Sequence, residues 1–315
     1  MNARKRIVLA GGAGLLGKLL AKSLSSKGYD IVVLSRSPRQ SDTKVVPWDA
    51  KSVGNWSREL DGAFAIINLT GRSVNCRYNE KNRRDILDSR VLSTKAIGEA
   101  ISRCTNPPPV WLNASTATIY KHSHDKPMDE NGEVAGTHDA KDEFSVEVAM
   151  AWEKALFDAN TPRTRKVALR ISMVLSDEPG SVFPVLRGLV RKGLGGAMAG
   201  GRQYVAWIHQ VDFCRAIEWI LTHKELSGGV NVAAPNPITN RDMMGALRRV
   251  SRVPIGLPAA RWMLEIGAFF MRTETELMLK SRRAVPGKLL ANGFKFEFSE
   301  FETATRNLET KIRGT

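Results

Sequence analysis

Residues 5–17 read KRIVLAGGAGLLG, in which a short apolar run passes directly into a glycine-rich loop. The apolar run at residues 7–10 predicts a buried strand. Gly11 permits a tight turn off that strand, Gly14 omits the side chain that would block a phosphate, and Gly17 allows the next helix to pack closely. The stretch therefore predicts the pyrophosphate site of a bound dinucleotide.

The residues after the loop favour that interpretation over a merely structural turn. Residues 18–24 have the apolar spacing of an amphipathic helix, and Gly28 provides its C-terminal stop. The N-terminus of such a helix presents free N–H groups and a positive dipole end to an anion. We therefore count Leu15 and Leu16 with the three glycines as cofactor-binding residues.

The next predicted strand, residues 30–37, indicates which dinucleotide would bind. An NAD site places an acidic residue at the end of this strand to hold the ribose 2′-hydroxyl, whereas an NADP site needs hydroxyls and an arginine for the 2′-phosphate. This strand ends in Ser35 and Arg36, and its one acid, Asp30, lies at its start. We predict NADP(H), with a solvated surface charge as the alternative role for Arg36.

Composition places the chain among globular proteins with a sizeable core. Its 315 residues suit one domain or a large domain with a small lobe, and 43% of them are hydrophobic. The three cysteines, Cys76, Cys104 and Cys214, have no paired spacing, so neither a disulfide framework nor a metal site is expected. A strand begins almost at residue 1 and no long apolar segment follows, which predicts a cytoplasmic protein without signal peptide or membrane span.

The net charge of +15 raises the possibility of nucleic-acid or anionic-membrane binding. The densest basic clusters, residues 248–252 and 280–283, are not interleaved with aromatic residues that could stack on bases. We therefore expect no specific nucleic acid and no membrane partner, and we interpret the charge as attraction for an anionic cofactor or substrate. The oligomeric state stays open.

Strands alternate with helices along most of the chain, which predicts an α/β, doubly wound parallel sheet. Further strands are predicted at residues 44–49, 62–71, 110–115, 166–171, 207–209 and 229–232, and helices at residues 79–103 and 144–159. From about residue 236 the chain is helical and basic. The predicted organisation is a Rossmann domain at residues 1–235, with substrate-lobe insertions after about residue 175, and a small, mainly helical domain at residues 236–315.

The chain resembles the extended short-chain dehydrogenase/reductases, and among them the atypical NAD(P)-dependent epimerase/dehydratase-like family 39U. The resemblance covers nearly the whole length, including the small C-terminal domain of that family. It is carried by residues 11–17, 34–38, 67–71, 88–90, 152–153, 169–175, 207–212, 231–235 and 285–294. It implies an NADP-binding Rossmann core with a smaller C-terminal substrate lobe.

The same resemblance implies further cofactor contacts. Leu69 and Thr70 match positions on the adenosine side, and Gly71, which follows them, is counted among the cofactor-binding residues. Asp85, Arg90 and Val174 also match positions that contact the cofactor, and a fixed arginine cation beside a polyanion is physically reasonable. The alternative for Arg90 is a pairing with an acidic residue of its own solvated helix.

The catalytic residues are where the chain departs from the family. Extended members use a Ser or Thr after the fifth strand and a Tyr-x-x-x-Lys pair, in which the lysine lowers the tyrosine pKa for proton transfer. Thr116 matches the hydroxyl position, but Phe144 and Val148 stand at the tyrosine and lysine positions. Neither side chain can transfer a proton, so the usual mechanism cannot operate.

Two other residues are candidates to replace the missing pair. Tyr120 lies close in sequence to Thr116, but without a lysine its phenol keeps an ordinary pKa of about 10. His209 has a useful pKa range for a contact with substrate, with Asp212 to orient it, or else it is a structural hydrogen-bonder. A hydrolase triad of Ser115 with nearby histidines would rest on sequence proximity alone.

Two functions therefore stay open at this point. One is an NADP(H)-dependent oxidoreductase or epimerase-like enzyme acting on an unknown small-molecule substrate, which Thr116 and the substrate lobe favour. The other is a non-catalytic NADP(H)-binding redox sensor or partner-binding protein, which the absent Tyr and Lys favour.

Overall fold

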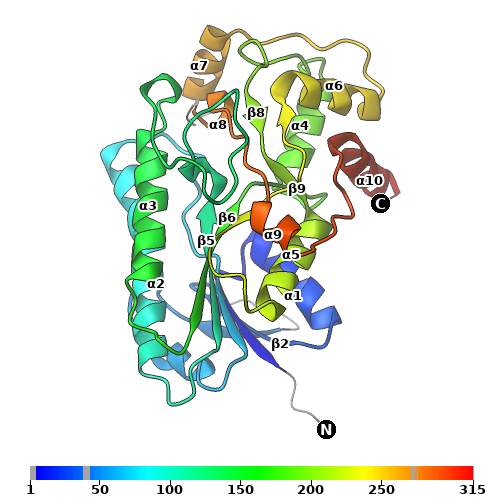
Figure 1. The fold of residues 1–315 in the computed structure, drawn as a ribbon. Coiled ribbons are helices and arrows are strands. Elements are labelled where there is room, and N and C mark those ends of the chain that lie inside the picture. Colours follow the sequence, from blue (N-terminus) through cyan, green and yellow to red (C-terminus); the bar gives the residue numbers. More distant parts are fainter. Residues whose placement is uncertain (1–4, 38–42, 271–273, 275, 315) are drawn as a thin grey trace.

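The computed structural model describes residues 5–37, 43–270, 274 and 276–314. Seven strands of this described chain form one sheet, in which all neighbours run parallel (Figure 1). In spatial order they are β10 (Gly228–Val232), β6 (Arg165–Ile171), β5 (Val110–Thr116), β4 (Ala65–Asn68), β1 (Arg6–Ala10), β2 (Asp30–Ser35) and β3 (Lys44–Pro47). The predicted α/β, doubly wound parallel sheet is confirmed.

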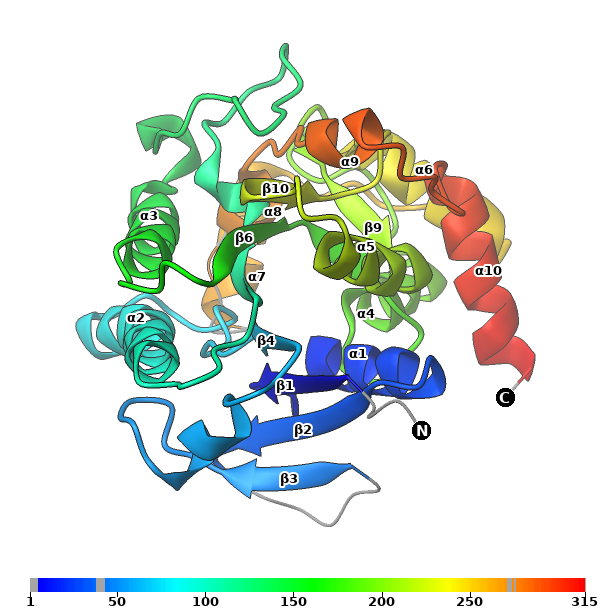
Figure 2. The ribbon, with the colours of Figure 1, turned by 60° about the horizontal axis from the view of Figure 1, so that its bottom comes forward.

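Helices cover both faces of this sheet (Figure 2). On one face lie α1 (Leu15–Ser26) and α5 (Gln210–Thr222), and on the other lie α2 (Glu80–Ser102) and α3 (Glu143–Phe157). Because successive side chains of a strand point to opposite faces, Ile7 and Leu9 of β1 enter the core under α1 and α5, whereas Val8 and Ala10 enter the core under α2 and α3.

The strand order creates a crevice at the carboxyl ends of the inner strands β1 and β4. After β3 the chain crosses to the far side of β1 and continues with β4, so the connections that leave β1 and β4 diverge. In open parallel sheets, ligands bind at such a switch point, beyond the carboxyl ends of the strands. The glycine loop after β1 and the loop after β4 meet at this place.

The predicted elements and the observed ones differ mainly at their ends. The helix predicted at residues 79–103 is α2, which begins after Asn79, whose side chain accepts a hydrogen bond from the Asn82 N–H. Gly28 has φ +86° and follows α1, as predicted. The strand predicted at residues 62–71 is shorter, because Gly62 has φ +72° and belongs to a turn. Pro38, part of one family motif, lies outside the described residues.

A second lobe packs beside the carboxyl ends of β6 and β10 (Figure 1). Its core joins Phe183, Trp207, Met244, Phe301 and Leu308. These residues belong to α4 (Val182–Arg191), β9 (Trp207–His209), α6 (Asn240–Ser251) and α10 (Phe301–Gly314). The lobe thus shares one core between residues before and after 235, and the division of the chain at residue 235 stays a prediction.

Short elements complete the described chain. The strands are β7 (Met173–Leu175), β8 (Tyr204–Val205) and β11 (Ile238–Thr239), and the helices are α7 (Arg261–Phe270), α8 (Glu276–Leu279) and α9 (Gly287–Ala291). Three 3-10 turns are η1 (Asn55–Glu59), η2 (Ala117–Ile119) and η3 (His138–Ala140). None of the helices within the described ranges has the length and apolar character that crossing a membrane requires.

Candidate functional site

Two hollows meet above the glycine loop and form one elongated groove. The β2 hollow, of about 1020 Å³, lies over the ends of β1 and β2, and the α3 hollow, of about 620 Å³, lies between the glycine loop and α3. Both hollows are lined by Gly11, Gly14, Leu69 and Gly71. The groove therefore has two unlike compartments joined over the residues that the sequence assigns to a pyrophosphate.

The glycine loop has the geometry that its sequence predicts. Gly11 has φ +73°, and a Cβ on it would lie 2.9 Å from the Thr70 backbone nitrogen. A Cβ on Gly17 would lie 2.4 Å from the Gly12 Cα, so α1 packs against the loop as only glycine allows. By contrast, a Cβ on Gly14 would meet a single atom within 4 Å, the Gly11 carbonyl oxygen at 3.5 Å. Gly14 thus borders open space, where a ligand can approach the backbone.

The N-terminus of α1 presents groups that favour the binding of an anion. Gly14 is the N-cap and contributes no side-chain hydrogen bond to the first turn. The N–H groups of the first turn, from Leu15 onward, have no acceptor within the helix. Lys18 and Lys22 of the same helix line the β2 hollow. Backbone donors, the helix dipole and two ammonium groups therefore all favour negative charge at this place.

The loop after β4 is held by buried amides and offers a free hydroxyl. The Asn68 side chain donates to Asn113 Oδ1 at 2.8 Å and accepts from the Thr70 N–H at 3.0 Å. Thr70 lines the β2 hollow, and its buried Oγ1 has no hydrogen-bond partner among the described residues. A buried hydroxyl without a partner costs free energy, so this one is suited to a polar group of a ligand.

The end of β2 has hydroxyls and a cation, as the sequence predicts. Ser35 is buried and its Oγ accepts from the Ser37 N–H at 3.2 Å, whereas Arg36 and Ser37 are exposed, and all three line the β2 hollow. Asp30 lies at the other end of the strand, 3.6 Å from the Arg6 guanidinium. No carboxylate of the described chain lines the β2 hollow.

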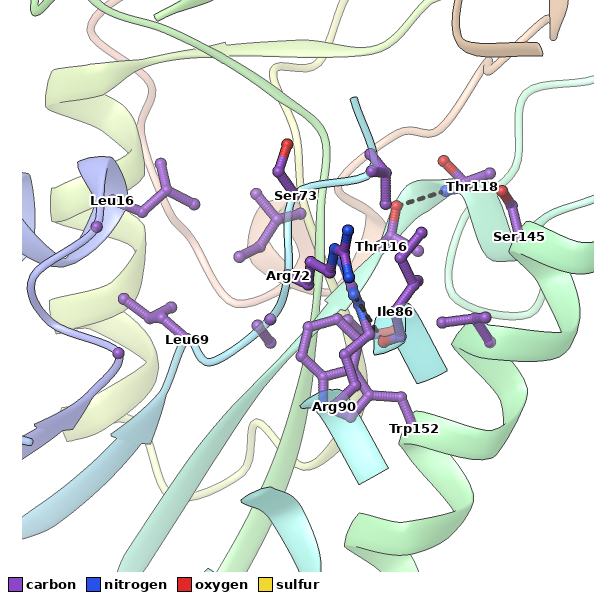
Figure 3. A pocket seen from close by; sticks show the side chains of 18 of the residues that line it. Leu16, Leu69, Arg72, Ser73, Ile86, Arg90, Thr116, Thr118, Ser145 and Trp152 are labelled. Carbon is purple, nitrogen blue, oxygen red and sulfur yellow. Dashed lines mark hydrogen bonds between the residues drawn. The ribbon is translucent and has the colours of Figure 1, made fainter. Parts of the chain in front are cut away.

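Arg90 places a half-buried cation in the α3 hollow (Figure 3). Its guanidinium lies over the Trp152 ring, 5.1 Å from the centroid, and donates to the Ile86 carbonyl at 2.9 Å. Burial lowers the pKa of Arg90 to about 10. Within the described chain it forms no ion pair, so the acidic partner considered from the sequence does not reach it. An anionic ligand group would relieve this uncompensated charge.

The residues expected at the reacting centre line the α3 hollow. Figure 3 shows Thr116, Thr118 and Ser145 on one side of it and Leu16 and Leu69 on the other. Thr116 Oγ1 accepts a hydrogen bond from the Thr118 N–H at 3.1 Å, which orients its oxygen and leaves its own proton for another acceptor. Phe144 and Val148 also line this hollow. The structure thus brings Thr116 together with the two apolar residues that the family motif places at the tyrosine and lysine positions.

Sequence reasoning missed several residues of the groove. Lys18, Lys22, Arg72, Ser145 and Glu276 all line it. The two lysines follow the glycine loop at helical spacing and could have been inferred from the sequence. Glu276 could not, because it lies 160 residues beyond Thr116 in a segment without a motif.

Tyr120 does not lie in either hollow. It is 3% exposed, its hydroxyl donates to Asn231 Oδ1 at 2.8 Å, and it accepts from the Arg170 guanidinium at 2.8 Å. Burial raises the pKa of Tyr120 to about 12, in spite of the neighbouring Arg170. The geometry gives this phenol a structural role between β5, β6 and β10, away from Thr116.

Two of the cofactor positions implied by the resemblance also lie outside both hollows. Val174, in β7, packs in the core under α5. Asp85 pairs with Arg72, which itself lines the α3 hollow, so Asp85 contacts a residue of the groove without lining it. The triad considered from the sequence is not assembled either, because the Ser115 hydroxyl donates to Glu153.

His209 is buried and serves as a helix cap. It is fully buried, its Nδ1 accepts from the Val211 N–H at 3.2 Å at the start of α5, and its ring lies 3.9 Å from that of Phe298. Asp212 does not orient it, because that carboxylate accepts hydrogen bonds from the N–H groups of Glu297 and Phe298. Burial, and next the charge of Lys311, lowers the pKa of His209 from 6.5 to about 4.

This burial predicts a pH-dependent stability. In the unfolded chain His209 becomes protonated below about pH 6.5, whereas in the folded chain it stays neutral down to about pH 4. Because the unfolded state binds more protons in this range, the free energy of unfolding falls by about 3 kcal/mol as the pH is lowered from 6.5 to 4. In His209→Asn, which keeps an N-cap acceptor, this part of the loss should vanish. Urea unfolding at neutral pH and at about pH 4 measures it, with the fully exposed His138→Asn as control. An equal acid loss in the parent and His209→Asn would contradict the assignment.

Two family models match the chain. The model described as the NAD dependent epimerase/dehydratase family matches residues 7–233. A model described as a domain of unknown function, DUF1731, matches residues 259–308. The first covers β1 to the end of β10, and the second covers α7, α8 and α9 and much of α10.

Similar proteins match over nearly their whole length. The epimerase family protein YfhF of Bacillus subtilis is 30% identical over 305 residues, which are 96% of this chain and 97% of that protein. The human epimerase family protein SDR39U1 is 27% identical over 312 residues, which are 96% and 99% of the two chains.

Solved structures of similar proteins have the same fold as this chain. The crystal structure of human SDR39U1 (isoform 2) with NADPH has a TM-score of 0.85 and 25% identity, and covers 97% of this chain and 99% of that one. A nucleoside-diphosphate sugar epimerase from Corynebacterium glutamicum has a TM-score of 0.74 and 24% identity, and covers 99% of this chain and 62% of that one. The second likeness shows the fold alone.

Proposed function

This chain belongs to the NAD dependent epimerase/dehydratase family, and we propose that it binds NADP(H) and acts as an oxidoreductase or epimerase-like enzyme on a small-molecule substrate. The observation that carries the proposal is the two-part groove over the glycine loop, with Thr116 at one end and Ser35 and Arg36 at the other. The human relative whose structure matches this chain was solved with NADPH.

The groove fits such a cofactor residue by residue. The pyrophosphate would lie against Gly11 and Gly14, at the first-turn N–H groups of α1 from Leu15 to Gly17. The 2′-phosphate would lie at Ser35 and Arg36, since no carboxylate of the described residues lines that hollow to compete for the position. The partnerless hydroxyl of Thr70 would complete its hydrogen bonding on the adenosine side.

The α3 hollow would take the reacting end of the cofactor and the substrate. NADP(H), when bound, supplies or accepts a hydride there. Thr116 would orient a carbonyl or hydroxyl oxygen with its free O–H. Phe144 and Val148 close the hollow as apolar walls that exclude water and cannot exchange protons. The proposal includes an unidentified small-molecule substrate in this hollow. It also includes a cytoplasmic location, because the three free cysteines suit a reducing compartment.

Cofactor choice provides the direct test. NADPH should bind more tightly than NADH, and Arg36→Ala should remove most of that preference, about 1.5–3 kcal/mol for a charged hydrogen bond to the 2′-phosphate. Calorimetric titration of both cofactors measures the difference, and Arg191→Ala, an exposed arginine outside both hollows, is the matched control. Equal affinities for NADPH and NADH in the parent protein would refute the NADP(H) assignment.

Turnover decides between an enzyme and a sensor. Phe144 and Val148 in the α3 hollow specifically favour a non-catalytic NADP(H)-binding protein as the second candidate. Consumption of NADPH in the presence of panels of carbonyl compounds and nucleotide sugars would support the enzyme. Tight NADPH binding without turnover, together with a cofactor-dependent affinity for a protein partner, would support the sensor.

A further inference from the structure

Glu276 is a buried carboxylate in the α3 hollow that no part of the family motif explains. It lies on α8, within the region matched by the domain of unknown function, and is 3% exposed. Its Oε2 accepts a hydrogen bond from the Ser145 hydroxyl at 2.9 Å. Its Oε1 is buried and accepts no hydrogen bond from the described residues, and the Arg282 guanidinium lies 4.0 Å away. One oxygen is thus anchored by Ser145, and the other is buried beside Arg282 with unused capacity to hydrogen-bond a ligand group.

The segment that carries Glu276 is tied to the residues around Thr116. The Lys280 ammonium pairs with the buried Asp142 and donates to the Thr118 carbonyl at 2.6 Å. The Arg282 Nε donates to Thr118 Oγ1 at 3.0 Å. Thr118 in turn donates its N–H to Thr116 Oγ1. These bonds fix Lys280 and Arg282, which follow Glu276 in the chain, against the same turn that orients Thr116.

Titratable groups from three parts of the chain surround Glu276. Tyr78 faces it from the loop before α2, Asp142 from the start of α3, and Lys280 and Arg282 from its own segment. Burial raises the pKa of the Glu276 carboxyl and Asp142 adds to the rise, while the Ser145 hydroxyl, Arg282 and Lys280 oppose it. A carboxyl with a raised pKa holds a proton closer to neutral pH, as general acids and bases require.

We propose that Glu276 is the acid–base residue of this site and exchanges a proton through Oε1 with the substrate oxygen that Thr116 orients. The inference rests on the proposed function. In reduction, the substrate carbonyl carbon receives a hydride from NADPH, the C=O π bond opens, and the oxygen takes the proton of Oε1. The products are an alcohol, NADP⁺ and the Glu276 carboxylate, which regains its proton from water. Oxidation runs the same transfers in reverse.

Glu276→Gln tests the proposal, because the amide keeps an acceptor for Ser145 but cannot titrate. With 9,10-phenanthrenequinone as the carbonyl probe, kcat for NADPH oxidation should fall by about 10²-fold, and its dependence on pH should flatten. The Kd for NADPH should stay within about twofold of the parent value, since Glu276 lies outside the hollow assigned to the phosphates. Glu147→Gln, an exposed glutamate on the same helix as Ser145, is the matched control.

Infrared difference spectroscopy provides a readout that needs no turnover. The parent should show the C=O band of a protonated carboxylic acid that titrates above the ordinary glutamate range and is missing in Glu276→Gln. Unchanged kcat and pH profile in a variant that binds NADPH would overturn the role of Glu276 and leave the proposed function standing. If the parent does not bind NADPH, the proposed function fails. If the parent binds NADPH but does not reduce the quinone, the infrared band of the protonated Glu276 carboxyl is the remaining test. Absence of this band in the parent would overturn the inference.

Discussion

Gly14→Val is expected to abolish NADPH binding while the protein stays folded. Gly14 has φ −75° and ψ 173°, a conformation that valine adopts readily, and its Cβ would meet only one atom within 4 Å. The two added methyl groups would instead project toward the place where the pyrophosphate must approach the first-turn N–H groups of α1. We expect the affinity to fall more than about 100-fold, or about 2.8 kcal/mol. Calorimetric titration measures the affinity, and circular dichroism measures the fold.

Two further glycine variants make this result specific. Gly188→Val adds the same side chain on α4, where a Cβ meets nothing within 4 Å, and should bind NADPH like the parent. Gly17→Ala should unfold or strongly destabilise the protein, because its Cβ would lie 2.4 Å from the Gly12 Cα. An unchanged NADPH affinity in folded Gly14→Val would mean that the glycine loop is only a turn.

Thr116→Val should remove turnover and spare cofactor binding. The change deletes a hydroxyl and keeps the volume, so the α3 hollow retains its shape while a substrate oxygen loses its donor. The loss of one such donor costs about 10²–10³-fold in kcat, or about 2.7–4 kcal/mol. The lost hydrogen bond from the Thr118 N–H costs stability of only about 1 kcal/mol. NADPH oxidation with 9,10-phenanthrenequinone gives kcat, and titration gives the Kd for NADPH.

The control for this variant is Thr310→Val, an exposed threonine on α10 whose hydroxyl bonds only within its own helix. It should keep both kcat and Kd. If Thr116→Val keeps full activity, the reacting oxygen lies elsewhere in the groove. If it loses NADPH binding instead, Thr116 contacts the cofactor itself.

The features predicted correctly from the sequence are those that depend on neighbouring residues. The apolar run before Gly11 and the glycine spacing up to Gly17 define a strand, a turn and a helix whose geometry is local, and the structure reproduces it. The positions of Ser35 and Arg36 were predicted for the same reason, because they are fixed by where the strand β2 ends. Thr116 also lies where its motif predicts, because β5 ends at it.

The predictions for Tyr120 and His209 show where local information stops. Tyr120 is four residues from Thr116, but the turn η2 intervenes and the ring ends in a buried network with Arg170 and Asn231. His209 lies on a short strand as predicted, yet its burial depends on Phe298, which packs on it from 89 residues away. Burial is a property of the assembled core, so no local pattern reveals it.

The sequence by itself therefore determined the parallel α/β sheet and the geometry of the glycine loop, because periodicity and backbone conformation act over a few residues. Tertiary structure alone decided which side chains share the α3 hollow. Glu276 reaches Ser145 across 131 residues, because the C-terminal segment returns to the turn after β5 and is tied there to Thr118 through Lys280 and Arg282. The acid–base chemistry of the site depends on that long-range packing, since burial both positions the carboxylate and raises its pKa.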